Sequence, residues 1–218
     1  MPRLALLLAA ALLAVPATAS AQEAVTLSAP VDGADLGAGV PTTIEADSGG
    51  LLDFIAIQVD GAPKCVLTLR PARCAWTPTQ ADIGDHTITA LSLLRDGAVL
   101  STATARVTVG RLIPPAVSAA TVRKRYGRTG RRLTTTGRVE LPAGLTASAC
   151  GGRVTVTVRH GRRTIVDRSV PVGADCAFSS VATFRPPKRA SSVRVAVAFA
   201  GAPLLAPRAA TTQTVRLR

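Results

Sequence analysis

The chain of 218 residues has very few aromatic side chains, namely four Phe, one Tyr and one Trp, or 3% of its residues. Its core must therefore consist of small and β-branched side chains, which favours β-sheet over a helical bundle. Histidine is also scarce, since the chain contains only His86 and His160, far apart in the sequence. Zinc sites need closely spaced ligand pairs, and the isolated pair Asp32 and Asp35 lacks the other oxygen ligands of a calcium site. We therefore predict no metal site and no cofactor.

Motifs of catalytic sites are missing as well. The chain has no G-x-S-x-G sequence that would present a serine nucleophile, and most carboxylates of its first half lie in or near turn dipeptides rather than in facing pairs. His86 directly follows Asp85, but neighbouring residues of a strand point to opposite faces, so the two cannot form a base and its orienting partner. We expect a protein that is not an enzyme, with His86 near the rim of a strand.

Long apolar runs are missing except near the start of the sequence. Arg3 precedes an apolar run from Leu4 to Val15, and a small-residue Ala-Ser-Ala sequence ends at Ala21. This is the pattern of a secretory signal peptide cleaved after Ala21. A membrane anchor is the alternative, but the apolar run would span only about 18 Å of the ~30 Å hydrocarbon core. We expect residues 1–21 to be removed and the mature chain, with no integral membrane span, to be secreted or held at the extracellular cell surface.

Each half of the chain is poor in charge of one sign. Residues 22–110 carry five basic and ten acidic side chains, a net charge of −5, whereas residues 111–218 carry twenty basic and three acidic ones, a net charge of +17. Such asymmetry indicates two units with different surroundings. Pro114 and Pro115 exclude a central strand and stiffen the chain between the units. We predict an acidic unit at 22–110, a proline-containing linker at 111–116 and a basic unit at 117–218.

Both units consist of short segments typical of β-strands. The first has seven short runs, separated by turn signals such as Asp60-Gly61 and Asp96-Gly97. In the second, residues 153–160 and 192–200 alternate valines with other side chains, as half-buried antiparallel strands do. No helical period is evident. The sequence therefore predicts an all-β protein of two tandem antiparallel β-sandwiches.

Four segments of the first unit occur in a familiar order: VTLSAPVDGADLG, IAIQVDGAPKC, CAWTPTQADIGDHTITALSLLRDG and a last strand that ends in VTV. Over residues 25–109 they resemble the bacterial Ig-like domains of secreted and surface proteins. The second unit, with TTTGRVELPAGLT, ACGGRVTVTVRHGRRTI and DCAFSSVATF, resembles an Ig/fibronectin-like sandwich. The resemblance implies adhesion, spacing or polymer binding, although a fold alone does not determine a function.

The chain has four cysteines, Cys65, Cys74, Cys150 and Cys176. In an oxidising compartment an even number of cysteines indicates disulfides, and the pairing Cys65–Cys74 with Cys150–Cys176 keeps each bond within one unit. The first bond would clamp a hairpin beside the Asp60-Gly61 turn. Neither pair has the Cys-x-x-Cys spacing of a redox site. We interpret the only tryptophan, Trp76, as a core residue rather than a surface for stacking on sugars.

The densest charge lies in residues 123–132, RKRYGRTGRR, which we call the basic strip. Its six cationic residues are Arg123, Lys124, Arg125, Arg128, Arg131 and Arg132. A flexible cationic segment can bind polyanions such as nucleic acid, cell-wall phosphate polymers or acidic lipid head groups. Nucleic-acid readers interleave several aromatic residues with their basic groups, so the single Tyr126 argues against nucleic acid. The alternative is a solvated connector in an arginine-rich chain, and the sequence leaves both open.

These features predict an exported, non-catalytic Ig-like protein for extracellular binding or structural display. In this hypothesis the basic unit is held against anionic cell-wall or membrane-surface polymers, and the acidic unit projects outward. A second hypothesis is a soluble secreted module that binds a carbohydrate or an extracellular protein. A third is an accessory protein or inhibitor of a partner enzyme.

Overall fold

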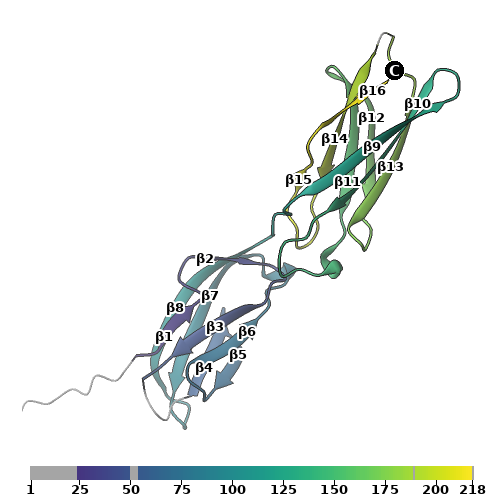
Figure 1. Cartoon of the computed structure of the whole chain (residues 1–218). Helices are drawn as coiled ribbons and strands as arrows, with labels where there is room; N and C mark the ends of the chain where they lie inside the picture. Colours follow the sequence, from purple (N-terminus) through teal and green to yellow (C-terminus); the bar gives the residue numbers. More distant parts are fainter. Residues whose placement is uncertain (1–23, 50–53, 189, 218) are drawn as a thin grey trace, which may run out of the picture.

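The computed structural model describes residues 24–49, 54–188 and 190–217. These residues form two β-sandwiches that lie end to end, with β1–β8 in the first and β9–β16 in the second (Figure 1). The predicted fold class, two tandem β-sandwiches, is confirmed. The predicted signal peptide at 1–21 lies outside the described residues. Within the described part of the chain, no helix is long and apolar enough to cross a membrane.

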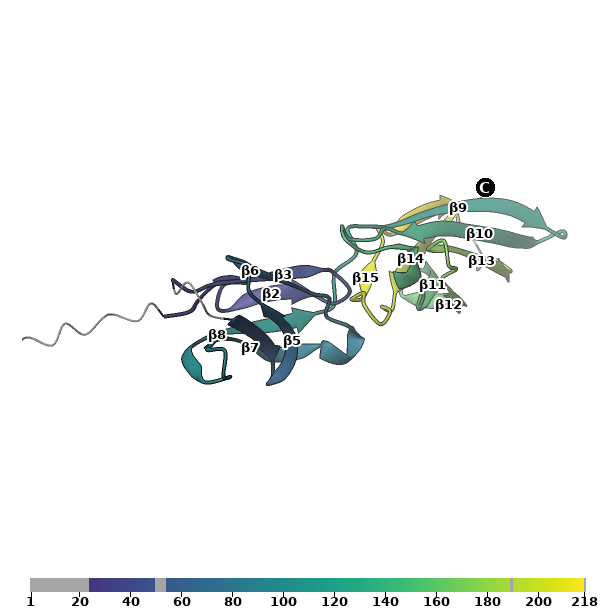
Figure 2. The same cartoon turned by 90° about the horizontal axis from the view of Figure 1, so that it is seen from below.

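The first sandwich has a three-stranded sheet of order β1-β3-β6 and a five-stranded sheet of order β2-β8-β7-β4-β5. Neighbouring strands are antiparallel except β2 and β8, which are parallel. The elements are β1 (Thr26–Ala29), β2 (Ala34–Gly37), β3 (Thr42–Asp47), β4 (Phe54–Val59), β5 (Ala62–Leu67), β6 (Ala72–Trp76), the short 3-10 helix η1 (Gln80–Asp82), β7 (Gly84–Leu93) and β8 (Val99–Gly110). This arrangement is that of an Ig-like sandwich, and its two layers are visible in Figure 2.

The second sandwich pairs a sheet of order β13-β10-β9 with a sheet of order β12-β11-β14, in which β15 and β16 both pair with β14. Its elements are β9 (Val117–Tyr126), β10 (Gly130–Val139), the 3-10 helix η2 (Ala147–Ala149), β11 (Arg153–His160), β12 (Arg163–Pro171), β13 (Ala177–Phe184), β14 (Ser192–Phe199), β15 (Arg208–Ala209) and β16 (Gln213–Arg216). This is the Ig/fibronectin-like arrangement.

The cores follow from the alternation of the strands. In the second unit, the valines of β11 and β14 are buried at every other position, with Phe199 beside them. In the first unit, Ile44, Ile57 and Ile88 are fully buried and Trp76 is 5% exposed. Trp76 is therefore a core residue, as we interpreted it. Mostly aliphatic side chains fill both sandwiches, because the sheets face each other closely and few aromatic groups are available.

The predicted linker is fixed to the loop between β14 and β15. The Leu112 amide donates to the Leu204 carbonyl at 3.0 Å, and the Ala206 amide donates to the Leu112 carbonyl at 2.8 Å. The Leu204 side chain also packs against the core of the first unit. A Cβ added at Gly39 would lie 2.8 Å from Leu204 Cδ1 and 2.9 Å from Leu145 Cδ2. The two sandwiches therefore abut through close packing of leucines on glycine.

The structure contains both disulfides with the pairing that the sequence favoured, Cys65–Cys74 and Cys150–Cys176. The proposed hairpin clamp was wrong, however. Cys65 lies on β5 of the five-stranded sheet and Cys74 on β6 of the three-stranded sheet, so this bond joins the two layers. The turn at Asp60-Gly61 was predicted correctly, because the chain reverses there between β4 and β5. The next strand, β6, however, belongs to the other sheet.

Candidate functional site

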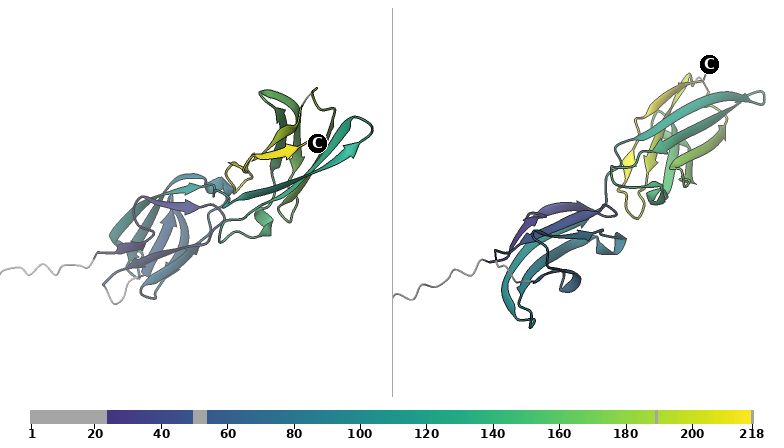
Figure 3. Two further views of the ribbon diagram at one scale, coloured as in Figure 1. Left: turned by 45° about the horizontal axis from the view of Figure 1, so that its top comes forward. Right: turned by 60° about the horizontal axis from the view of Figure 1, so that its bottom comes forward.

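The basic strip forms a β-hairpin rather than a flexible connector. Its first residues are the end of β9 and its last residues the start of β10, with Tyr126 opposite Gly130 and Lys124 opposite Arg132. Gly127 adopts a positive φ of 61° in the turn, a conformation that glycine adopts without strain. The glycines therefore shape a tight turn instead of loosening the backbone. The hairpin tip lies at the end of the second unit far from the first (Figure 3).

The hairpin divides five of its six cations between two faces. Directly opposite residues of paired strands share a face, so Lys124 and Arg132 lie together on the outer face of the sheet. Arg125 and Arg131 share the other face, where Arg131 Nε donates to the Leu217 carbonyl at 3.1 Å. Arg123 lies on that face too, opposite the buried Leu133, and Arg128 lies in the turn. The strip is thus brought together in space, but not as one continuous cationic surface.

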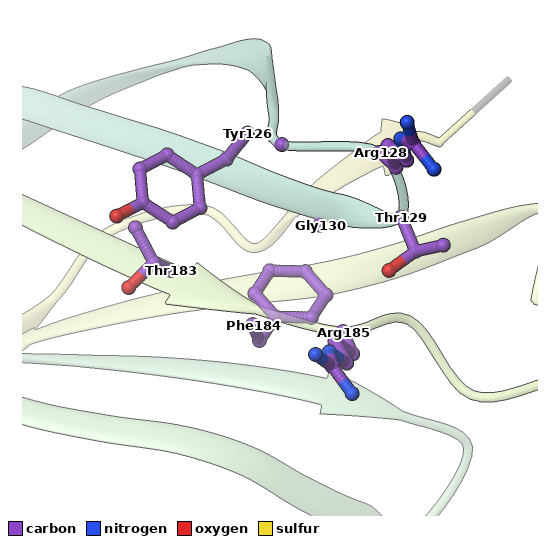
Figure 4. A pocket seen from close by; sticks show the side chains of 8 residues that line it. Tyr126, Arg128, Thr129, Gly130, Thr183, Phe184 and Arg185 are labelled. Carbon is purple, nitrogen blue, oxygen red and sulfur yellow. The ribbon is translucent and has the colours of Figure 1, made fainter.

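A hollow of about 310 Å³ lies between the hairpin tip and the end of β13, and we call it the tip hollow. Tyr126 lies on one side of it, Arg128 and Arg185 lie on the other, and Phe184 lies between them (Figure 4). Thr129 and Thr183 add two hydroxyl groups to the lining, and no acidic residue of the described part of the chain belongs to it. The Tyr126 side chain is exposed, at 57% for the residue.

The packing of the hairpin fixes the shape of the tip hollow. Gly130 is buried, and a Cβ at this position would collide with the carbonyl oxygen of Tyr126, so glycine permits the close approach beneath the tyrosine. On the other side, Thr183 pairs with Arg132 and Phe184 with Arg131 across β10 and β13. The Phe184 ring packs against the core of the second unit. The hollow therefore has a supported floor.

Sequence reasoning missed the contribution of Thr183, Phe184 and Arg185, which lie more than fifty residues from the strip. The alternation in AFSSVATF was a usable signal for a strand, but nothing local indicates that this strand pairs with β10.

The two ion pairs between described residues, Arg73–Glu45 at 2.9 Å and His86–Asp60 at 2.5 Å, both lie in the first unit.

His86 is the centre of a second polar cluster. Its Nδ1 lies 2.5 Å from Asp60 Oδ2 and its Nε2 lies 2.6 Å from the carbonyl oxygen of Asp82. The Thr87 amide donates to Asp60 Oδ1 at 2.8 Å, and the Trp76 ring meets the imidazole edge-on with centroids 5.7 Å apart. His86 is the third residue of β7, near the start of the strand as expected, and only 13% of its side chain is exposed.

The geometry of this cluster favours the charged imidazole. A carbonyl oxygen and a carboxylate both accept hydrogen bonds, so both ring nitrogens of His86 are donors when both bonds form. Burial alone lowers the pKa of His86, but the bonds to Asp60 and to the Asp82 carbonyl raise it above its ordinary value. The Thr87 amide and His86 hold the pKa of Asp60 below its ordinary value. Because both ring nitrogens are bonded, His86 links the β4–β5 turn, which holds Asp60, to the η1 turn, which holds Asp82.

Asp82 belongs to the same cluster through the η1 turn. Its Oδ2 accepts from the Thr79 amide and from the Thr79 hydroxyl, both at 2.7 Å, and these bonds lower its pKa below the ordinary value. Across residues 24–49, 54–188 and 190–217, no group of three His, Cys, Asp or Glu side chains is placed to hold a metal ion.

No family model and no curated protein matches the chain. Among solved structures, it is similar to the fibronectin(III)-like modules of Clostridium thermocellum CbhA, at 20% identity and a TM-score of 0.35 over 39% of this chain and 94% of that one. It is also similar to Rst D1-D2, at 10% identity and a TM-score of 0.37 over 89% of this chain and 98% of that one. A β-glycosidase from Bacteroides vulgatus gives 9% identity and a TM-score of 0.31 over 90% of this chain, which spans about a quarter (25%) of that chain's length.

Proposed function

We propose that this chain is an exported, non-catalytic protein that binds anionic polymers of the cell envelope through its second sandwich and displays its first sandwich outward. The observation that carries the proposal is the cationic hairpin at the end of the second unit farthest from the first (Figure 3). The predicted signal peptide and the two disulfides are what an exported protein needs in an oxidising compartment.

The distribution of charge supports an oriented arrangement. The second unit carries the basic excess and the first carries the acidic excess, so an anionic surface attracts one end of the molecule and repels the other. The close packing of Leu204 on the first core keeps the two ends apart. Because exposed charges are screened beyond about 8–10 Å at physiological salt, the hairpin tip contributes to binding mainly when it touches the polymer.

A pull-down with purified cell envelopes tests the proposal. The mature chain is compared with a hairpin variant, Lys124→Gln, Arg128→Gln and Arg132→Gln, and with a control of equal charge loss, Arg159→Gln, Arg162→Gln and Arg163→Gln. The control residues are exposed at the β11–β12 turn of the other sheet. We expect retention that falls with salt and is weakened most by the hairpin variant. Absence of retention at low salt would refute envelope binding.

A further inference from the structure

We propose that the tip hollow binds one acidic sugar unit of a polysaccharide, with Tyr126 against the sugar ring and with Arg128 and Arg185 on its carboxylate or phosphate group. This deepens the proposed envelope binding and rests on it for the source of the polymer. It differs from diffuse attraction because it requires a specific pocket with an anion site and a ring site side by side.

The anion site comes from two arginines that belong to separate segments. Arg128 lies in the hairpin turn and Arg185 follows β13, yet both line the same side of the hollow (Figure 4). Arginine presents a planar fork of donors that fits a carboxylate or a phosphate in a bidentate way. Among the described residues, no acidic side chain lines the hollow to neutralise them. Two arginines in the lining of an open cavity therefore favour a ligand with a fixed anionic group.

The ring site is formed by the only tyrosine of the chain. Tyr126 is 57% exposed, so its ring is open to a ligand, and a Tyr side chain combines an apolar ring with a polar tip. Thr129 and Thr183 bring hydroxyl groups that can both donate and accept hydrogen bonds, as sugar hydroxyls require. A volume of about 310 Å³ is at the small end of ligand pockets, which suits one sugar unit better than a peptide.

The outer face of the sheet offers a continuation for a polymer. Thr183 pairs with Arg132, and Arg132 pairs with Lys124, so two more cations lie on the same outer face as a hydroxyl of the hollow. All three side chains are exposed. A chain of acidic sugars could therefore place one unit in the hollow and the next against Lys124 and Arg132. Nucleic acid fits less well, because base stacking along a strand needs several aromatic side chains and the lining offers one exposed ring.

The hollow is preformed, which lowers the entropic cost of binding. Gly130 lets the hairpin close tightly under Tyr126, and Phe184 packs against the core. Neither segment needs to be ordered by the ligand. The side chains to be replaced in a test are exposed, so the variants are expected to fold.

The test is calorimetric titration of the mature chain at about 150 mM salt with four probes: a galacturonate trimer, a glucose-6-phosphate-terminated trisaccharide, a neutral galactose trimer and a dT oligomer. The first two separate carboxylate from phosphate as the anion. We expect at least one acidic sugar to bind and the neutral trimer not to bind. Equal binding of neutral and acidic trimers, no binding of either acidic sugar, or tighter binding of the dT oligomer would overturn the proposal.

Variants locate the binding. We expect Tyr126→Ala and Arg185→Gln each to weaken binding of the acidic probe about tenfold, as interface Tyr and Arg residues often do, and Tyr126→Phe to restore most of it. Arg162→Gln, with the same loss of charge on the other sheet, should leave it unchanged. If Tyr126→Ala binds the acidic probe as the wild type does, the hollow is not the site. If Tyr126→Ala is also retained by envelopes while the hairpin variant is not, the envelope proposal stands and the sugar-site proposal fails.

Discussion

The His86 cluster makes the stability of the first sandwich depend on pH. His86 has a raised pKa, so the stability it contributes is fully present below the ordinary value of 6.5 and is lost as pH rises through the folded-state pKa. We therefore expect the free energy of unfolding of the first unit to fall as pH rises above the ordinary histidine value of 6.5. The sign is opposite for the carboxylates Asp60 and Asp82, whose pKa values are lowered. The stability that they contribute is present at neutral pH and is lost only when they are protonated at acid pH.

The magnitude follows from the two hydrogen bonds. Neutral imidazole has one N–H, so deprotonation leaves either Asp60 or the Asp82 carbonyl without its donor. Bonds to charged groups contribute roughly 1.5–3 kcal/mol, but the Asp60 side chain is 51% exposed and water replaces part of that bond. We expect a loss of about 1 kcal/mol across this pH range.

The sequence offers a selective assay, because Trp76 is the only tryptophan and contacts His86 edge-on in the first core. Urea unfolding followed by Trp76 fluorescence therefore reports this unit at each pH. His86→Gln should remove most of the decline, whereas His160→Gln, which replaces the other histidine in the second unit, should keep it. A wild-type stability that is flat or rises over this range, or a decline unchanged in His86→Gln, would show that the charged His86 does not stabilise the first unit.

Three further predictions concern the scaffold. From the sequence separations of 9 and 26 residues, replacing both cysteines of a pair by alanine should lower the free energy of unfolding by about 2.6 kcal/mol for Cys65–Cys74 and about 3.5 kcal/mol for Cys150–Cys176; calorimetry that finds no loss for either pair would contradict this. Gly137→Ala should destabilise the second unit by roughly 1–3 kcal/mol because its Cβ would meet the Ser118 carbonyl and the Phe178 ring, whereas Gly110→Ala, with open space around it, should not. Gly39→Ala should widen the distribution of inter-unit distances in small-angle scattering, because its Cβ would displace Leu204. Gly61→Ala, also at positive φ but with no neighbour within 4 Å, should leave that distribution unchanged. Equal scattering from the two variants would exclude a packed junction.

The fold could be predicted from the sequence because strand signals are local. Residues 153–160 form a strand with the bounds that the sequence predicts, since alternation and turn residues decide it without reference to the rest of the chain. The parallel pairing of β2 with β8 could not be predicted in this way, because it joins residues about seventy positions apart.

The candidate site was predicted only in part for the same reason. The basic strip was identified by its composition, but its division into two faces depends on the register of β9 and β10. Arg185 reaches the hollow only through the pairing of β13 with β10. Asp60 and His86 are 26 residues apart, and the pairing of β4 with β7 brings the β4–β5 turn beside His86. Each of these contacts is set by tertiary packing, which overrides the local pattern.

The most direct test of the account is the salt dependence of envelope binding by the mature chain. The logarithm of the binding constant should fall linearly with the logarithm of salt concentration, because each cation that meets the polymer releases counterions, with a slope of roughly 0.7–0.9 per contact on nucleic-acid polyanions. We expect Lys124→Gln, Arg128→Gln and Arg132→Gln together to make this slope distinctly shallower than the equal charge loss at Arg159, Arg162 and Arg163 does. A slope near zero for the wild type, or the same change in both variants, would contradict binding through the hairpin.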